Sequence, residues 1–281
     1  NLAFSWLGGR NAWLGNCRES PLRFIRRLAH DVKSRINCRS EEAYRRKIAA
    51  KVSGAICIST SIEGYAKKLG IKNTIMIPNG GPDVFEDTAP PPSTSKQRGK
   101  LNVVYAGSSI YPWQGLDILS DVIREAEKRQ SPVTFTLVVN GPTDDIPSFS
   151  NVEVFSKLSR EDALEKMREA DLTVALIPKW WWSPIGFHGS PTKIFEYMAM
   201  GAPVLTSNHS QMKELFTHRK DAFLVDNNPD EIVTLLEQLH REPDSLKTVG
   251  DNGKQLVKSQ LNWQNVAAKT EQFIAPSVKQ K

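Results

Sequence analysis

The residues of this sequence that are best suited to chemistry lie in one run, Phe-His-Gly-Ser-Pro-Thr-Lys-Ile-Phe-Glu-Tyr-Met-Ala-Met-Gly at 187–201. Ser190 is a preferred N-cap residue, and Pro191 suits the first helical position because its missing N–H is not needed there. The final glycine, followed by Ala-Pro, ends the helix. The helix therefore begins with free backbone N–H groups at Thr192 and Lys193, at the positive end of its dipole. Together with the lysine ammonium, these groups predict a binding site for an anion such as phosphate.

Two polar residues of this helix, Thr192 and Glu196, are four residues apart and therefore share one helical face. The apolar Ile194, Phe195 and Met198 lie on the other sides, where they can pack against a core. A simpler interpretation is a capped, half-buried helix with one solvated glutamate. The elements on either side of the helix favour the anion site.

Strands alternate with helices through the larger, C-terminal part of the chain, which predicts a parallel α/β sheet. Strands are expected at 101–106, 133–139, 152–155, 172–176, 203–206 and 222–225, and helices at about 116–127, 160–169, 191–200, 210–217, 229–240, 244–259 and 263–273. In a doubly wound sheet the ligand lies beyond the carboxyl ends of the strands. The helix start at 190–193 follows one such strand, so it lies where a ligand is expected.

A smaller α/β unit precedes this one. A helix is expected over 41–52, a strand at 55–58, a helix capped by Ser59-Thr60-Ser61, and a strand at 74–77 closed by the turn Pro78-Asn79-Gly80-Gly81. The proline-rich, polar segment 86–100 is the best linker candidate. We therefore expect a partial N-terminal domain at 1–85, a linker at 86–100, a C-terminal domain at 101–260 and a helix at 261–281 that crosses back to the N-terminal domain.

The charge of the chain is uneven. The formal net charge is +6 over 281 residues, and residues 1–50 contain eleven Lys and Arg against four Asp and Glu. Residues 22–36 combine helical apolar spacing with basic residues, which fits a helix at an anionic membrane surface or an ordinary domain helix with a solvated basic face. Three cysteines without metal-ligand spacing fit a reducing cytosol, and no run of 18 apolar residues is present. We expect a cytoplasmic protein, with peripheral contact at the inner face of a membrane left open.

Four motifs resemble those of family 4 glycosyltransferases, also called glycosyltransferases group 1. They are Ile-Pro-Asn-Gly-Gly at 77–81, Val-Val-Tyr-Ala-Gly at 103–107, Trp-Gln-Gly-Leu-Asp at 113–117 and the run at 189–204. The resemblance implies a GT-B architecture, in which two Rossmann-like domains face a cleft. It implies a hexosyl-type transferase that holds a nucleotide-diphosphate sugar in the C-terminal domain and a glycan or lipid-linked acceptor in the N-terminal domain. Transfer would retain the anomeric configuration and use no metal or other cofactor.

Carried over residue by residue, the family's second motif glutamate falls on Glu196, where it would hydrogen-bond the ribose hydroxyls of the nucleotide. The first motif glutamate, which contacts the donor sugar, falls on His188, so either the histidine takes that contact or the site is weakened. These two residues are the catalytic candidates. The other donor-binding candidates are the loop and helix-start residues Gly107, Ser108, Ser109, Gln114, Gly189, Ser190, Pro191, Thr192 and Lys193.

A basic pair that many members carry is missing from this sequence. Ser108 or Ser109 occupies the arginine region, and Gln114 stands where a lysine is expected. Lys193 is the nearby replacement for the diphosphate charge, and a lysine at a helix start opposes the dipole, which favours an anion partner. The tryptophan run 180–182 precedes the helix in a loop, where it would stack on a sugar or pack against the other domain.

These departures leave a binding-only module of the same fold as a second interpretation. A nucleic-acid-binding protein is a third, motivated by the sequence pI near 9.2. The basic excess is confined to one end and no reading motif is present, so we expect no nucleic-acid partner. The first unit has about 85 residues and two clear strands, whereas a Rossmann-like domain needs on the order of 150. We therefore expect an incomplete acceptor domain in this chain, with nucleotide binding but no sugar transfer.

Overall fold

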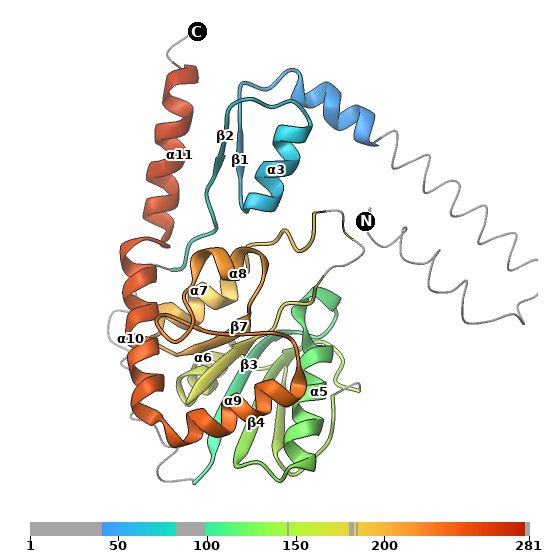
Figure 1. Ribbon diagram of the computed structural model, residues 1–281, viewed down its shortest axis with the longest axis vertical. Coiled ribbons are helices and arrows are strands. Elements are labelled where there is room, and N and C mark those ends of the chain that lie inside the picture. Colours follow the sequence, from blue (N-terminus) through green and yellow to red (C-terminus); the bar gives the residue numbers. More distant parts are fainter. Residues whose placement is uncertain (1–40, 83–98, 145, 180–182, 184, 279–281) are drawn as a thin grey trace, which may run out of the picture.

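The computed structural model describes residues 41–82, 99–144, 146–179, 183 and 185–278. Three features of the sequence lie outside these residues: the basic segment 22–36, most of the linker candidate 86–100 and the tryptophan run 180–182. The described part contains two parallel β-sheets, a larger one in the lower half of Figure 1 and a smaller one above it.

Six parallel strands form the larger sheet, in the order β5-β4-β3-β6-β7-β8. They are β3 (Leu101–Ser108), β4 (Val133–Asn140), β5 (Val152–Ser156), β6 (Leu172–Ala175), β7 (Val204–Ser207) and β8 (Phe223–Val225). The six predicted strands are confirmed. β3 extends two residues beyond its predicted end because Gly107 and Ser108 pair with Val139 and Asn140 of β4. The chain order reverses between β3 and β6, which is where a doubly wound sheet binds its ligand.

Helices cover both faces of this sheet (Figure 1). They are α5 (Leu116–Lys128), α6 (Arg160–Arg168), α7 (Thr192–Ala199), α8 (Ser210–Leu215), α9 (Pro229–Arg241) and α10 (Pro243–Ser259). Apolar residues of α5 and α9 join a buried cluster with Val103 and Tyr105, whereas those of α6, α7 and α8 join one with Val104. Successive strand residues point to opposite faces, so the two clusters lie on opposite sides of the sheet. α10 contacts both α7 and α9.

The smaller sheet pairs β1 (Ala55–Cys57) with β2 (Thr74–Met76) in parallel, and α3 (Thr60–Lys68) connects the two strands. A helix over 41–49 precedes β1. Ser59 caps α3, as the sequence predicts, because its hydroxyl accepts the Ile62 N–H at 3.4 Å. The carboxyl ends of β1 and β2 are followed by Ser59 and Asn79, respectively, two residues that reach the larger unit.

α11 (Trp263–Val278) follows α10 and runs beside the smaller sheet (Figure 1). Two contacts join α11 and the residues just before it to the smaller unit. The Gly81 N–H donates to the Leu261 carbonyl at 2.7 Å, and a Cβ on Gly54 would lie 3.0 Å from the Phe273 ring. Among the described helices, none is both long enough and apolar enough to cross a membrane. The boundaries expected for the two domains stay a prediction.

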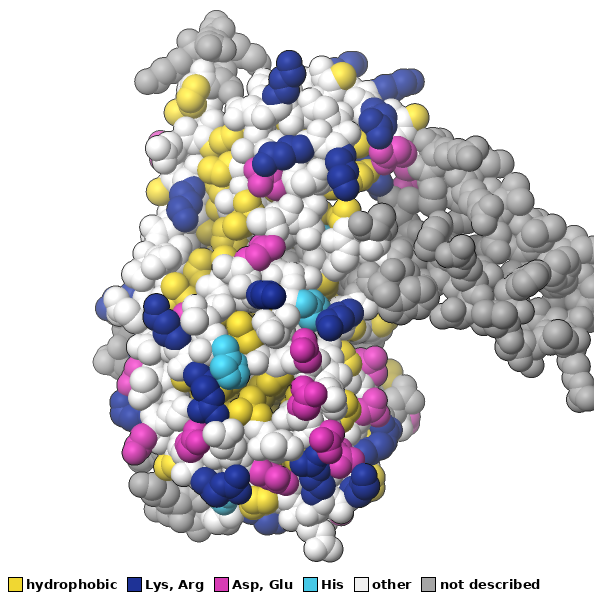
Figure 2. Space-filling model, viewed as in Figure 1, with side chains coloured by type: hydrophobic (Ala, Val, Ile, Leu, Met, Phe, Trp, Pro, Cys, Tyr) yellow, Lys and Arg dark blue, Asp and Glu magenta, His cyan; other side chains and the backbone are white. Residues whose placement is uncertain are grey.

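Charge on the described surface is mixed. Figure 2 shows Lys and Arg side chains interspersed with Asp and Glu side chains over the face in view. Some of these charges are paired along one helix, as Lys128 is with Glu125 at 3.2 Å. The basic excess expected for residues 1–50 falls mainly on residues 1–40, which lie outside the described chain.

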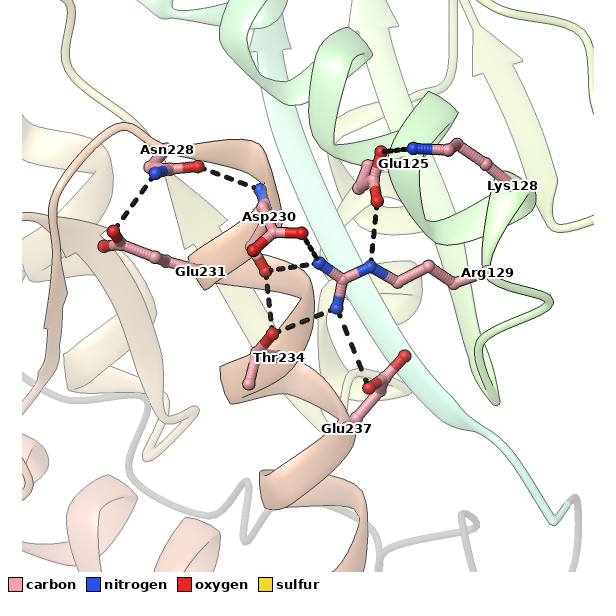
Figure 3. A network of polar contacts seen from close by, with 8 residues as sticks. All are labelled: Glu125, Lys128, Arg129, Asn228, Asp230, Glu231, Thr234 and Glu237. Carbon is pink, nitrogen blue, oxygen red and sulfur yellow. Dashed lines mark hydrogen bonds and ion pairs between the residues drawn. The ribbon is translucent and has the colours of Figure 1, made fainter.

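A polar network joins the end of α5 to α9 (Figure 3). At its centre is the half-buried guanidinium of Arg129, whose Nε donates to Glu125 at 2.9 Å. Its other nitrogens donate to the Thr234 hydroxyl and the Asp230 carbonyl, each at 3.0 Å, and pair with the carboxylates of Asp230 and Glu237. The network connects α5 to α9. Both helices cover the same face of the larger sheet and lie away from the smaller unit (Figure 1).

We expect Arg129→Met to lower the midpoint of thermal unfolding by about 2–4 °C. Each partly exposed ion pair contributes little to the stability of the fold, but this substitution removes several of them at once because they share the Arg129 guanidinium. The effect should shrink at high salt, since ionic screening weakens these pairs in the unmodified protein. Arg124→Met is the matched control, because this exposed arginine of α5 pairs, among the described residues, with Asp121 alone. Equal shifts in the two variants would contradict a special role for the network.

Candidate functional site

Two loops meet where the chain order of the larger sheet reverses. The loop after β3 runs to Gly115, and the loop after β6 runs to the start of α7. Gly115 has φ 67°, and a Cβ there would lie 2.0 Å from the Leu176 carbonyl oxygen. A glycine is therefore required for the first loop to pass this close to the end of β6.

Lys193 connects the two loops. Its ammonium lies 4.4 Å from the centre of the Tyr105 ring and hydrogen-bonds the Gln114 side-chain oxygen. A Cβ on Gly107 would lie 2.6 Å from that nitrogen, so the glycine makes room for it. Burial lowers the pKa of Lys193 to about 8, and the Glu196 charge opposes that shift. Within the described chain no carboxylate pairs with this ammonium, so it is a half-buried cation that lacks a neutralising partner there.

The start of α7 differs from its prediction. Ser190 was expected to cap the helix, and this is wrong: the N-cap residue is Pro191, the helix begins at Thr192, and no side chain caps it. The Ser190 hydroxyl instead accepts the Asn79 N–H at 3.0 Å, while the Asn79 side chain donates to the Ser190 carbonyl at 2.8 Å. Among the described residues, nothing accepts a hydrogen bond from the N–H groups of Thr192 and Lys193, so the helix presents open donors beside the half-buried ammonium.

The body of α7 is anchored in the core. Ile194, Phe195 and Met198 are buried, as predicted. Tyr197, which the sequence did not single out, hydrogen-bonds Ala106 of β3 twice: its hydroxyl donates to the carbonyl at 3.0 Å and accepts the N–H at 2.9 Å. These contacts hold the helix against β3. Thr192 and Glu196 are exposed on the face that remains.

The loop before α7 is half-buried around His188. Its Nδ1 lies 3.2 Å from the Gly186 carbonyl, and its own carbonyl accepts a hydrogen bond from the Ser59 hydroxyl at 3.0 Å. Gly189 follows, where a Cβ would lie 2.6 Å from the Phe187 ring. The absence of a side chain at 189 therefore lets the chain turn past this phenylalanine.

The two serines after β3 differ in their environment. The Ser108 hydroxyl accepts the Ile110 N–H at 3.2 Å, and its carbonyl accepts from the Tyr105 hydroxyl at 3.2 Å. The Ser109 hydroxyl is buried and has no hydrogen-bond partner in the described part of the chain. A buried polar atom without a partner is costly, so this one is suited to contact a bound polar group.

The structure brings Gly107, Gln114 and Lys193 into direct contact. It adds residues that the sequence did not assign to the site, chiefly Asn79 and Ser59. The sequence motif around Asn79 was interpreted as a turn and as one of the four family-like motifs, but no ligand-site role was given to its residues. Over the described residues, no cluster of three or more His, Cys, Asp and Glu side chains is arranged to hold a metal ion.

Comparison with known proteins connects this geometry to one family. A family model described as glycosyl transferases group 1 matches residues 100–242. The chain is 26% identical over 182 residues to the MMP alpha-(1->4)-mannosyltransferase of Mycolicibacterium hassiacum. That alignment covers 62% of this chain and 42% of the mannosyltransferase.

Two solved structures have a similar fold. The sucrose-phosphate synthase of Thermosynechococcus elongatus gives a TM-score of 0.64 at 16% identity, over 86% of this chain and 63% of that one. Anabaena Alr3699/HepE in complex with UDP and glucose gives 0.62 at 19% identity, over 80% and 64%. The chain thus spans less than two thirds of the length of each relative. The expected α/β architecture of GT-B type is confirmed.

Proposed function

Because the chain belongs to the group 1 glycosyltransferases, we propose that its site serves the transfer of a sugar from a nucleotide-diphosphate sugar to a glycan or lipid-linked acceptor, with retention of the anomeric configuration. In this reaction the bond between the anomeric carbon and the diphosphate oxygen breaks. The acceptor hydroxyl forms a new bond to that carbon and loses its proton. The nucleoside diphosphate leaves with the negative charge that develops as the sugar departs.

One observation carries the proposal: a half-buried ammonium, paired with no carboxylate of the described chain, lies beside the open start of α7, at the reversal point of the larger sheet. Fixed donors aimed at a developing charge stabilise the transition state because they do not have to reorganise. We assign the diphosphate to the Lys193 ammonium and to the open backbone N–H groups at the start of α7, with the backbone at Ser190, Pro191 and Thr192 forming the turn that surrounds it. The protein lysine, and no metal ion, then supplies the neutralising charge.

We place the remaining candidate residues around the bound diphosphate. Glu196, exposed on α7, accepts from the two ribose hydroxyls, since a carboxylate offers two acceptor oxygens to a vicinal diol. His188 contacts the donor sugar from the neighbouring loop, and Gly189 lets that loop come close. Ser109 hydrogen-bonds the donor with its otherwise unpartnered hydroxyl, while Gly107, Ser108 and Gln114 shape the opposite wall.

We expect Glu196→Gln to weaken binding of a nucleoside diphosphate by about 10–150-fold, which corresponds to roughly 1.5–3 kcal/mol for a hydrogen bond to a charged group. Titration calorimetry measures the change. A 2′-deoxynucleotide should show a smaller difference between the two proteins, because it lacks one of the hydroxyls. Glu161→Gln, an exposed glutamate at the start of α6, is the matched control. Equal affinities in the unmodified and Glu196→Gln proteins would remove Glu196 from the site.

The function itself is tested by titrating the chain with UDP, with GDP and with an unrelated oligonucleotide. Binding of one nucleoside diphosphate and not of the oligonucleotide supports the proposal. HepE has been solved with UDP-glucose, so uridine is the base to try first. Tight oligonucleotide binding would favour the nucleic-acid alternative, although on the face in view in Figure 2 acidic side chains are interspersed with the basic ones.

Measuring turnover distinguishes a transferase from a module that only binds the sugar nucleotide. The sugar nucleotide that binds is incubated with the protein, and release of nucleoside diphosphate is followed with and without candidate acceptors. Acceptor-dependent release supports transfer by this chain. Binding without release in any condition would support the module interpretation for residues 1–281.

A further inference from the structure

The smaller unit reaches into the donor site through two residues. The Ser59 hydroxyl donates to the His188 carbonyl at 3.0 Å. Asn79 makes two hydrogen bonds to Ser190: its N–H donates to the serine hydroxyl, and its side chain donates to the serine carbonyl. Both residues follow the carboxyl end of a strand of the smaller sheet. We call this pair of contacts the clamp. It holds both residues that flank Gly189, just ahead of α7.

The clamp decides what the Ser190 hydroxyl does. A serine two residues before the first helical residue can turn its hydroxyl toward the helix and accept one of the open N–H groups. Here the hydroxyl faces Asn79 and accepts its N–H, and Ser190 is buried with 7% of its surface exposed. In this orientation the hydroxyl accepts no N–H of α7, and the helix start has no side-chain cap. The second hydrogen bond, to the Ser190 carbonyl, fixes the orientation of the peptide that leads into Pro191.

We propose that Asn79 is a positioning residue for the donor diphosphate: by holding Ser190, it keeps the first N–H groups of α7 open and directed at the ligand. The inference rests on the proposed function. Asn79 acts through Ser190 and does not itself need to contact the donor. It also makes the diphosphate site of the C-terminal unit depend on a residue from the smaller unit.

If Asn79 served only to connect the two units, the contacts would be the same but the effect of its loss on ligand binding would differ. If Asn79 only tethers, its loss affects all ligands of the C-terminal unit alike or affects none. If it positions the helix start, its loss weakens binding of the diphosphate and leaves the ribose contact unchanged, because Glu196 lies one turn further along α7, which Tyr197 holds against β3. The ratio of diphosphate affinity to nucleoside affinity separates the two.

The experiment compares UDP, UMP and uridine by titration calorimetry on the full chain, or the guanosine series if GDP is the nucleotide that binds. Asn79→Ala removes the side-chain donor, and we expect about a tenfold loss of UDP affinity, a smaller loss for UMP and none for uridine. Asn79→Asp keeps the shape but places a carboxylate against the Ser190 carbonyl, so the loss for UDP should be larger. Asn73→Ala is the matched control, because this exposed asparagine lies in the same unit and its side chain makes no hydrogen bond within the described chain.

Ser190→Ala provides a second variant, in case Asn79→Ala does not fold. It removes the acceptor of the Asn79 N–H, and it should lower the affinity for UDP while uridine binds as before. In the double variant the combined loss should be smaller than the sum of the two single losses, since the two hydrogen bonds join the same pair of residues.

Unchanged UDP affinity in Asn79→Ala, or an equal loss for UDP and uridine, would overturn the inference and leave the proposed function standing. Absence of UDP and GDP binding by the unmodified chain would instead overturn the proposed function, and the inference with it.

Discussion

Replacing Lys193 by methionine should weaken UDP binding by about 10–150-fold, as large an effect on binding as we expect from any one side chain. The ammonium is the cation that the described chain places beside the open start of α7, and its side chain spans the two loops of the site. Methionine preserves most of the length and the apolar contact with Tyr105 while removing the charge. Uridine, which carries no phosphate, should bind both proteins equally.

The control for this change is Lys213→Met, in which an exposed lysine of α8 is lost without effect on the site. A general influence of net charge would weaken UDP binding in both variants by the same factor. If Lys193→Met binds UDP as tightly as the unmodified protein, the diphosphate does not lie on this ammonium.

The pH dependence of UDP binding provides a second test of the role of Lys193. Burial lowers the pKa of Lys193 from 10.5 to about 8, so the free protein loses this charge as the pH rises from 7 to 9. A terminal phosphate is already ionised in that range. UDP affinity should therefore fall with rising pH, and binding near pH 8 should take up a proton. Lys193→Met should show a flatter profile.

The same group affects the stability of the free protein in the opposite direction. Between about pH 8 and pH 10.5 the unfolded chain holds a proton on Lys193 that the folded chain has lost. Stability rises with pH wherever the unfolded state binds more protons. The contribution of Lys193 to the free energy of unfolding should therefore increase across this window, and comparison with Lys193→Met in chemical denaturation isolates it.

Gly115→Ala should have the largest effect on stability. An alanine at φ 67° is strained, and its Cβ would lie 2.0 Å from the Leu176 carbonyl oxygen, a backbone atom that cannot move aside easily. The two costs together predict a loss of about 2–4 kcal/mol in the free energy of unfolding. Because Gln114 precedes this glycine, surviving protein should also bind UDP more weakly.

Gly64→Ala is the matched control. Gly64 lies inside α3, and an added Cβ meets no atom within 4 Å. Alanine is favoured over glycine in a helix by roughly 0.5–1 kcal/mol, so this variant should be slightly more stable. If the two alanine substitutions have similar effects in urea unfolding, the close approach of the β3 loop to β6 does not contribute to stability.

Much of the architecture was determined by the sequence, because its signals are local. The apolar strand runs, the helix periodicity and the residues that end α7 depend on neighbours a few positions away, so the strands and helices of the larger sheet were predicted to within one or two residues at most ends. The chemical character of the 187–201 run, with its lysine and glutamate on one short helix, was also available from the sequence.

The arrangement of the site was decided by the tertiary structure. Ser190 has the residue type of an N-cap and could bond its own helix, yet it bonds Asn79, which is 111 positions away in the chain. Likewise, the sequence offered Lys193 as a replacement for a missing lysine near Gln114, but only folding brings its ammonium onto that glutamine. A polar side chain with several available partners takes the one that burial and packing bring within reach. That choice depends on residues distant in sequence, and no local pattern records it.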